Sequence, residues 1–350
     1  MTSQLPQTRP SSCCVCGSDD HALVLRTIDY LFHIPGEYSV VRCRNCGHRF
    51  LNPQPTPDSV HLCYPQNYGP HQTAASSVAT SSESPVEDTA PVPWYLRYLP
   101  LRRIPGLRAL YFWLTDDLGH PIPKLPENDQ PKLLELGCST GAWLLRAQQA
   151  GWCVTGVEPG DAPAQTARDA GLNVQTGLLS EVELETGTFD VAAAWMVLEH
   201  VYDPSETLRE LAAALRPGGQ LSFSVPNAGG IESALFRGSW YVWEPPRHLH
   251  FFSSRILKRL LREAGFTDIR IVHQRNALNL IGSLGILLKR IPLLKRLTAG
   301  IGERLIRYPE SPRLWLQLLL SPLAIGLAFL RQGGRLTVTA VKPSTGSEAG

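Results

Sequence analysis

The stretch LLELGCSTG (residues 133–141) decides the fold of this chain. An apolar strand runs directly into a tight turn, and the turn opens a helix. Gly137 and Gly141 let the backbone approach a ligand closely, because a Cβ at either position would collide with it. The free N–H groups at the start of the helix suit an anionic group, here a carboxylate. Glu135, at the end of the strand, is placed to face an ammonium group of the same ligand.

A second acidic residue stands at the end of the next expected strand, in GVEP (residues 156–159). Glu158 at this position would accept hydrogen bonds from both hydroxyls of a ribose. Ser139 stands where the dinucleotide pattern G-x-G-x-x-G has its middle glycine, which argues against a dinucleotide. On these residues alone, a Rossmann dehydrogenase and a turn with only a structural role remain as alternatives.

Short apolar strands alternate with amphipathic helices from Pro131 onward, which is typical of βαβ units and a parallel sheet. Asp203, followed by Pro204 and Glu206, marks the start of one of these helices. The expected fold class is α/β, a Rossmann-like doubly wound seven-stranded sheet whose last two strands form a hairpin. The expected strands are Lys132–Leu136, Cys153–Glu158, Asn173–Thr176, Phe189–Trp195, Gln220–Pro226, Thr267–Val272 and Arg335–Val341.

Several motifs in order resemble a known family. The segments ELGCSTG, GVEP, FDVAAAWMVLEHVYDP and LRPGGQLSFSVPN resemble class I S-adenosylmethionine-dependent methyltransferases of the quinone-biosynthesis and glycan-modifying kind. The resemblance covers residues 132–226, and HLHFFS (248–253) and AGF (264–266) extend it. It implies that S-adenosylmethionine is the methyl donor, with Leu178 beside the adenine and Met196 at the methionine end. The expected cofactor-binding residues are Glu135, Gly137, Ser139, Gly141, Glu158, Leu178 and Met196.

Histidines are the candidate catalytic residues. Methyl transfer from a sulfonium requires alignment of the acceptor and exclusion of water, and a base only when the acceptor carries a proton. We expect His200 and His248 in this role, since His200 lies at the carboxyl-terminal edge of the sheet, where open α/β folds bind ligands. The alternative for both, and for His250, is a packing role. Tyr64 and Tyr68 either fold over the cofactor or pack against a helix.

Two matching knuckles, Cys13-x-x-Cys16-Gly and Cys43-x-x-Cys46-Gly, stand near the N-terminus. Each pair brings two thiolates to one side of a turn, and four thiolates make a closed tetrahedral zinc site. The 26 residues between the pairs suit a zinc ribbon with an inserted hairpin. The predicted zinc is structural. Cys14 in place of Cys13, and His48 as a contributing ligand, remain alternatives.

Composition divides the chain into distinct regions. The first residues lack a basic start followed by an apolar run, so we expect a cytoplasmic protein in a reducing compartment. The regions are a zinc-binding module (1–69), a disordered linker (70–92), an amphipathic helical lead-in (93–128), the methyltransferase core (129–275), a basic apolar helical insertion (276–334), the last core strand (335–343) and a tail (344–350).

The insertion at 276–334 is basic and apolar together. Between Arg255 and Arg335 the chain has 15 Lys or Arg and 4 Asp or Glu. Apolar faces flanked by basic side chains bind anionic lipid interfaces, so peripheral membrane contact is one interpretation. A helical lid over the substrate is the other. Residues 314–330 fall short of the roughly 20 that a spanning helix needs, and we expect a helix pair broken at Pro322.

The sequence therefore predicts transfer of a methyl group to a small-molecule, sugar, glycan or lipid-linked acceptor, by O- or C-methylation. Similar zinc modules occur on deoxysugar carbon-methylating enzymes and on some ribosomal-RNA methyltransferases, so an RNA-directed enzyme is one rival. Nucleic acid is disfavoured, because the basic residues are interleaved with Leu and Ile rather than with aromatic residues. A non-catalytic zinc-dependent interaction protein is the other rival, against which Glu135, Gly137, Gly141 and Glu158 argue.

Overall fold

The computed structural model describes residues 5–65, 68, 120–291, 300–307 and 314–344. The expected linker, most of the helical lead-in and nearly all of the tail lie outside the described residues.

Strands and helices alternate through the core, as the apolar pattern predicts. The strand bounds match the expected ones except at β8 and β12, which shift by a single residue, and at β10. The core elements are β6 (Lys132–Leu136), α3 (Ala142–Gln149), β7 (Cys153–Glu158), α4 (Asp161–Asp169), β8 (Val174–Thr176), β9 (Phe189–Trp195), α5 (Pro204–Ala214), β10 (Leu215–Pro226), α7 (Ser254–Glu263), β12 (Thr267–His273) and β13 (Arg335–Val341).

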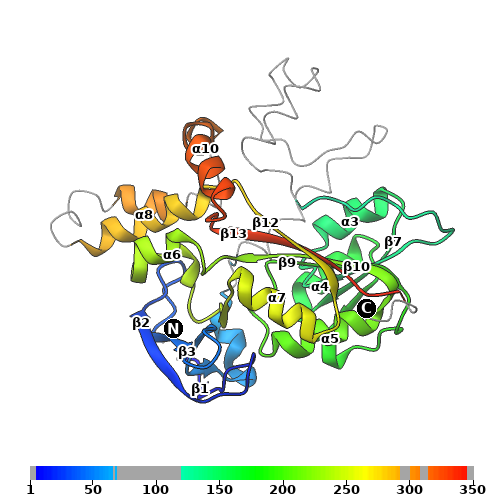
Figure 1. Cartoon of the computed structure of the whole chain (residues 1–350), viewed down its shortest axis with the longest axis horizontal. Coiled ribbons are helices and arrows are strands. Elements are labelled where there is room, and N and C mark those ends of the chain that lie inside the picture. The colour runs from blue at the N-terminus through cyan, green and yellow to red at the C-terminus, as the bar shows by residue number, and fades with distance from the viewer. Residues whose placement is uncertain (1–4, 66–67, 69–119, 292–299, 308–313, 345–350) are drawn as a thin grey trace.

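The core strands form a seven-stranded sheet at the centre of the molecule (Figure 1). Its order is β12-β13-β10-β9-β6-β7-β8. The strands from β10 to β8 run parallel, and β13 lies antiparallel between β12 and β10. The expected Rossmann-like fold with its terminal hairpin is therefore confirmed.

Helices cover both faces of this sheet, which explains why the central strand β9 is mostly apolar and almost entirely buried. Successive side chains of a strand point to opposite faces. Leu133 and Val191 pack on the face under α3 and α4. Leu134 and Ala192 pack on the opposite face with α5 and α7.

Helix α5 begins and ends as its sequence signals predict. The Asp203 side chain accepts hydrogen bonds from the backbone N–H groups of Ser205 and Glu206, both at 2.9 Å. The helix ends at Ala214, but β10 then begins at Leu215 rather than at Gln220. Leu215 pairs with Phe189 before the register shifts, so the Pro-Gly-Gly segment lies within the strand.

The N-terminal module shares a sheet with the core. Its four strands have the order β11-β4-β3-β2, and β11 comes from the segment before α7. His250 of β11 pairs with Phe50 of β4. The elements are β1 (Thr8–Arg9), β2 (His21–Thr27), β3 (Tyr38–Cys43), β4 (Arg49–Leu51), β5 (Gln54–Pro55), η1 (Pro57–Cys63) and β11 (His250–Phe251).

Helices occupy the described parts of the insertion between β12 and β13. They are α8 (Leu278–Arg290), a short helix at 300–306, and α10 (Leu314–Phe329). The expected break at Pro322 is wrong, because α10 runs through it. Pro322 has no N–H for the Leu318 carbonyl, and the Ser321 hydroxyl donates to that carbonyl instead, at 2.8 Å. Among the described residues, no helix has the length and apolar character needed to cross a membrane.

Candidate active site

The turn after β6 depends on glycine for both conformation and packing. Gly137 has φ +69° and Gly141 has φ +80°, in the left-handed region. A Cβ on Gly137 would lie 2.5 Å from Cγ2 of Val197, and one on Gly141 would collide with Leu172. The approach of a ligand is the reason for these glycines that the sequence predicts. The structure adds a second reason, since the turn packs tightly against its own protein neighbours.

The two acids expected at the cofactor face this turn from β6 and β7. Glu158 accepts hydrogen bonds from the backbone N–H groups of Ser139, at 2.8 Å, and Gly160, at 2.9 Å. Glu135 is buried, and its Oε2 has no hydrogen-bond partner among the described residues. Burial, with Glu158 nearby, raises the pKa of Glu135 well above its usual value. A buried acceptor without a donor fits the ammonium group of S-adenosylmethionine, which would supply both protons and positive charge.

The other two expected cofactor residues lie at the ends of β9 and β8. Met196 follows β9 with φ +57°, and its N–H donates to the Ser224 carbonyl at 2.9 Å. Leu178 is exposed, and its N–H donates to the Glu181 carboxylate at 2.9 Å. The apolar Leu178 side chain is therefore open to a planar ring, while its backbone N–H already has a partner.

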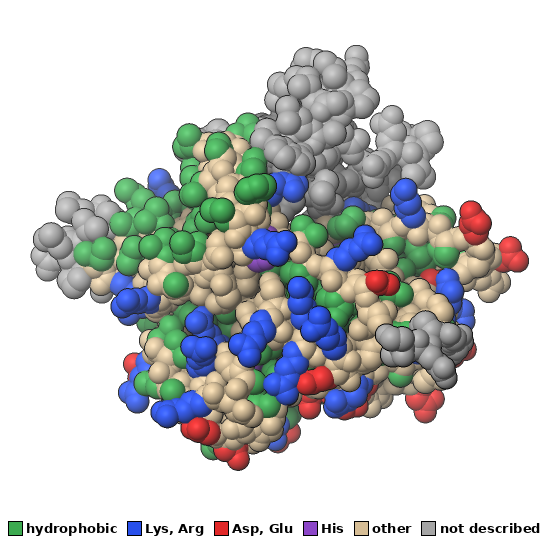
Figure 2. Space-filling view, in the orientation of Figure 1, with side chains coloured by type: hydrophobic (Ala, Val, Ile, Leu, Met, Phe, Trp, Pro, Cys, Tyr) green, Lys and Arg blue, Asp and Glu red, His purple; other side chains and the backbone are tan. Residues whose placement is uncertain are grey.

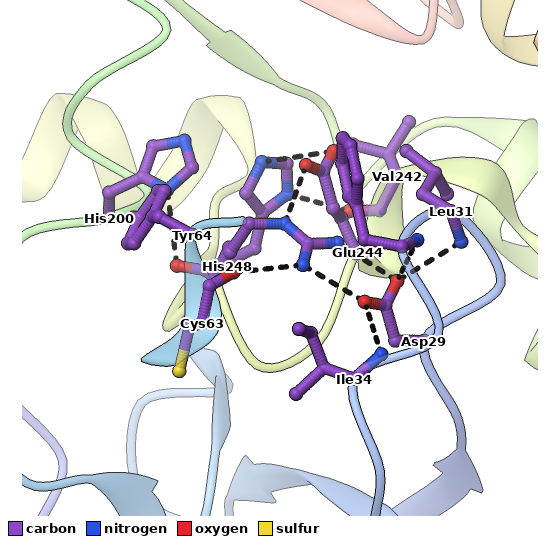
Figure 3. Close-up of polar contacts among 11 residues, drawn as sticks. Asp29, Leu31, Ile34, Cys63, Tyr64, His200, Val242, Glu244 and His248 are labelled. Carbon is purple, nitrogen blue, oxygen red and sulfur yellow. Dashed lines mark hydrogen bonds and ion pairs between the residues drawn. The ribbon is translucent and has the colours of Figure 1, made fainter. Parts of the chain in front are cut away.

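His200 and His248 lie together beyond the carboxyl end of β9 (Figure 3). Their ring centroids are 4.7 Å apart in an edge-to-face arrangement. Nδ1 of His248 donates to the Val242 carbonyl at 2.8 Å, so its Nε2 carries the lone pair of the neutral ring. Nδ1 of His200 lies 3.1 Å from the Arg247 carbonyl and 3.0 Å from the Tyr64 hydroxyl. Burial lowers the pKa of each histidine to about 3, so both rings are neutral at physiological pH.

Glu199 belongs to this cluster but is not among the site residues predicted from the sequence. Its side chain is fully buried, and neither carboxylate oxygen has a hydrogen-bond partner in the part of the chain that the structure describes. One oxygen lies within 4.8 Å of a ring nitrogen of His200 and of His248. Burial raises the pKa of Glu199 to about 8, and Arg335 partly opposes that increase. The signal in the sequence was an acid next to a histidine at the end of an apolar core strand.

Three further charged residues hold the loop that carries His248, and they too are not among the site residues predicted from the sequence. The Arg247 guanidinium donates to both Asp29 oxygens at 2.9 Å and, through Nε, to Glu244 at 3.0 Å (Figure 3). Glu244 Oε2 in turn lies 3.7 Å from Nε2 of His248. Because η1 and the Asp29 loop belong to the N-terminal module, that module forms one wall of the cluster.

Tyr64 and Tyr68 both pack in this cluster. Their rings meet edge to face with centroids 5.2 Å apart. Tyr64 contacts His200, and Tyr68 lies against Phe32 at 5.6 Å. The two tyrosines therefore extend the wall formed by the module.

The four knuckle cysteines converge on one point. The Sγ atoms of Cys13 and Cys46 are 3.5 Å apart, as are those of Cys16 and Cys43. In a tetrahedral site with Zn–S bonds of about 2.3 Å, sulfur atoms lie about 3.8 Å apart. All four ligand atoms lie within 4.8 Å of one another, so the cluster fits a zinc ion.

Comparison with known proteins agrees with this geometry. A family model for a methyltransferase domain matches residues 111–271. A ubiquinone biosynthesis O-methyltransferase of Vibrio parahaemolyticus is 31% identical over 173 residues, which cover 47% of this chain and 69% of that protein. The enzyme of the same name from Saccharophagus degradans is 30% identical over 182 residues, which cover 48% of this chain and 72% of the relative.

Solved structures that align with this chain are more distant in sequence. A phosphoethanolamine N-methyltransferase 2 of Haemonchus contortus, in complex with S-adenosyl-L-methionine, aligns with a TM-score of 0.43 and 18% identity, over 68% of this chain and 57% of that chain. An S-adenosylmethionine-dependent methyltransferase of Mesorhizobium loti aligns with a TM-score of 0.41 and 20% identity, over 62% of this chain and 94% of the other. The sheet order, the matching family model, and identities of 30% and 31% over more than two thirds of two curated relatives show that this chain belongs to the class I S-adenosylmethionine-dependent methyltransferases.

Proposed function

We propose that this enzyme transfers a methyl group to a hydroxyl oxygen of a lipid-linked small-molecule acceptor, with Glu199 as general base. The observation that carries the proposal is the buried Glu199 carboxylate, which has no hydrogen-bond partner among the described residues and lies beside two neutral histidines at the end of β9. An O-methyltransferase activity is also the one named for the curated relatives.

The cradle after β6 would hold the cofactor. Glu135 would accept from its ammonium group, and Glu158 from its ribose hydroxyls, with Gly137, Ser139 and Gly141 shaping the turn. When bound, S-adenosylmethionine supplies an electrophilic methyl group on a sulfonium centre. Gly137 of this turn also lies close to Val197, which stands two residues before Glu199. The cofactor-binding turn and the proposed base are therefore close together at the carboxyl end of the sheet.

The base is needed because a hydroxyl keeps its proton at neutral pH. A Glu199 carboxylate with a pKa near 8 is well matched to take that proton as the oxygen attacks, since a base works best near the operating pH. His248, held in one tautomer by Val242, would accept a hydrogen bond from the acceptor through Nε2 and orient it. We therefore assign His200 and His248 to positioning the acceptor within the catalytic cluster.

The insertion supports a lipid-linked acceptor. Helix α10 points polar Ser321 into the protein, where its residue is 5% exposed, and leaves Leu319 (65%), Leu323 (52%) and Phe329 (86%) exposed. A buried polar side chain together with exposed apolar side chains is the reverse of the pattern expected for a helix on a water-exposed surface. Figure 2 shows hydrophobic side chains gathered over α8 and α10, with Lys and Arg on the surface below them. Such a face suits contact with an anionic membrane surface.

The acceptor class is tested by following tritiated methyl groups. Purified enzyme with methyl-tritiated S-adenosylmethionine would be incubated with separate lipid, water-soluble and RNA fractions from the source cells. We expect label in an alkali-stable ether of the lipid fraction, lost in Glu199→Gln. Label confined to the RNA fraction would overturn the proposal in favour of an RNA-directed enzyme, and label in water-soluble compounds alone would overturn the lipid link.

The membrane contact is tested by co-sedimentation with vesicles. Wild type should bind vesicles that contain phosphatidylglycerol more tightly than pure phosphatidylcholine vesicles. The triple change Leu319→Ser, Leu323→Ser and Phe329→Ser should abolish binding. Leu23→Ser, an exposed leucine on β2, is the matched control and should leave it unchanged. Equal binding by the triple variant and wild type would favour the lid interpretation.

A further inference from the structure

We propose that Cys14, His48 and His250 form a second zinc site, distinct from the four-cysteine cluster, which fastens the N-terminal module to the catalytic core. The three residues come from three separate places in the fold. Cys14 lies within the first knuckle, His48 follows the second knuckle, and His250 lies on β11, which the core contributes to the module's sheet.

The spacing of the ligand atoms fits a tetrahedral ion. Nδ1 of His250 lies 3.1 Å from Nε2 of His48 and 3.6 Å from Sγ of Cys14. Zn–N bonds of about 2.0–2.1 Å and Zn–S bonds of about 2.3 Å place two nitrogens about 3.3 Å apart, and nitrogen and sulfur about 3.6 Å apart. All three ligand atoms lie within 4.8 Å of one another. A water molecule would complete the four ligands.

Hydrogen bonding alone accounts poorly for this arrangement. Nε2 of His250 lies 3.2 Å from the Tyr202 carbonyl, which can only accept, so Nε2 carries the proton and Nδ1 presents one lone pair. The Cys14 thiol and His48 Nε2 both converge on that single lone pair. A cation at the centre instead uses one lone pair from each of the three groups.

The surroundings match those of a structural metal site. His48 and His250 are buried, at 0% and 3% exposure, whereas Cys14 is partly exposed and leaves one side of the site open to the completing water. The bond from His250 to the Tyr202 carbonyl fixes the ring, as the outer hydrogen bond of a metal-binding histidine commonly does.

The site would reinforce the junction between the N-terminal module and the core. Strand β11 pairs with β4 through only two residue pairs, His250 with Phe50 and Phe251 with Arg49. A metal ion bound by Cys14 and His48 of the module and by His250 of the core would cross-link the two parts at this junction. Since His250 lies two residues after His248, the ion would also hold the loop that carries this part of the catalytic cluster.

The test is the metal content of the full-length protein, reconstituted with zinc and measured by inductively coupled plasma mass spectrometry. Cys14→Ala should hold one zinc equivalent fewer than wild type. Cys153→Ala removes an exposed cysteine outside the clusters and should hold as much zinc as wild type. Equal zinc in Cys14→Ala and wild type would overturn the proposal.

A cobalt titration of wild type decides the question if the variant does not fold. We expect two classes of bound Co²⁺. One should show the strong thiolate charge-transfer absorption of four sulfurs, and the other a much weaker band from one sulfur. A single class with four-sulfur intensity would overturn the proposal. Loss of that four-sulfur band in a folded Cys14→Ala would do the same, because it would place Cys14 in the four-cysteine site.

Discussion

The Arg247 guanidinium binds both oxygens of the Asp29 carboxylate at 2.9 Å, although the two residues are 218 positions apart in the chain. Neither side chain is exposed to solvent. Arg247 belongs to the loop before His248, and Asp29 belongs to the N-terminal module, where it also accepts hydrogen bonds from three backbone N–H groups. The ion pair therefore ties the N-terminal module to the loop that carries His248.

Arg247→Met should destabilise the protein by about 3–5 kcal/mol, because it leaves a buried carboxylate without its counter-ion. Arg209→Met, which removes an exposed ion pair with Glu206, should cost far less, because solvent screens an exposed pair. Urea unfolding followed by tryptophan fluorescence measures both. Equal losses of stability in the two variants would show that the buried Arg247–Asp29 pair stabilises the protein no more than an exposed pair does.

Glu199→Gln should reduce the methyl-transfer rate by roughly 10²–10⁴-fold, which is the usual contribution of a general base. The affinity for S-adenosylmethionine should not change, because Glu199 lies outside the cradle. Glu185→Gln, an exposed acid paired with Lys132, is the control and should retain full activity. A rate within threefold of wild type in Glu199→Gln would remove this residue from the mechanism.

The rate should rise with pH and reach a plateau above about 8, because only the ionised form of Glu199 accepts a proton and its pKa is about 8. The groups that face or influence it are His200, His248, Glu244, Arg335 and Tyr68. Both histidines stay neutral over this range, since their pKa values lie near 3. The measurement is kcat/KM from pH 6 to 9.5. A flat profile would contradict the assignment.

Stability should show the opposite trend. The pKa of Glu199 is higher in the folded state, at about 8, than its ordinary value of 4.5, so folding favours the protonated form. The contribution of this group to stability is complete below pH 4.5 and is lost as pH rises to about 8. Glu199→Gln should therefore be more stable than wild type at pH 9 by roughly 2–5 kcal/mol, and about equally stable at pH 4.5. Thermal unfolding at the two pH values tests this. A constant difference would contradict it.

Gly137→Ala should destabilise the turn more than Gly187→Ala does. Both glycines have nearly the same positive φ, +69° and +68°, so the backbone strain of about 1 kcal/mol is shared. Only at Gly137 would the new methyl group strike a neighbour, Val197. Gly137→Ala should also weaken S-adenosylmethionine binding at least tenfold in a calorimetric titration, while Gly187→Ala should not. Equal effects would show that packing against Val197 is unimportant.

Features that depend on local sequence were predictable. The glycine turn, the Asp203 cap and most of the strand bounds follow from short patterns, because these elements are determined by neighbouring residues and by the burial of both sheet faces. The convergence of the knuckle cysteines was also expected from their spacing.

Features that depend on tertiary contacts were not predictable. Glu199 has its raised pKa because distant segments exclude water from it, and no local pattern records that burial. Asp29, which pairs with Arg247, lies 218 residues away in the chain. Strand β11 has only two residues, which is too short for a strand pattern to show in the sequence. Helix α10 passes through Pro322 because a neighbouring serine satisfies the freed carbonyl, which overrides the usual preference of proline.

The most direct test of this account is a calorimetric titration of S-adenosylmethionine into wild type, Glu158→Ala and Glu199→Gln. We expect binding in the micromolar range, or about −8 kcal/mol, for wild type and Glu199→Gln, and none for Glu158→Ala. That result would separate the cofactor cradle from the catalytic base. Absence of binding by folded wild type, or equal loss of binding in both variants, would contradict the division of roles between the two sites.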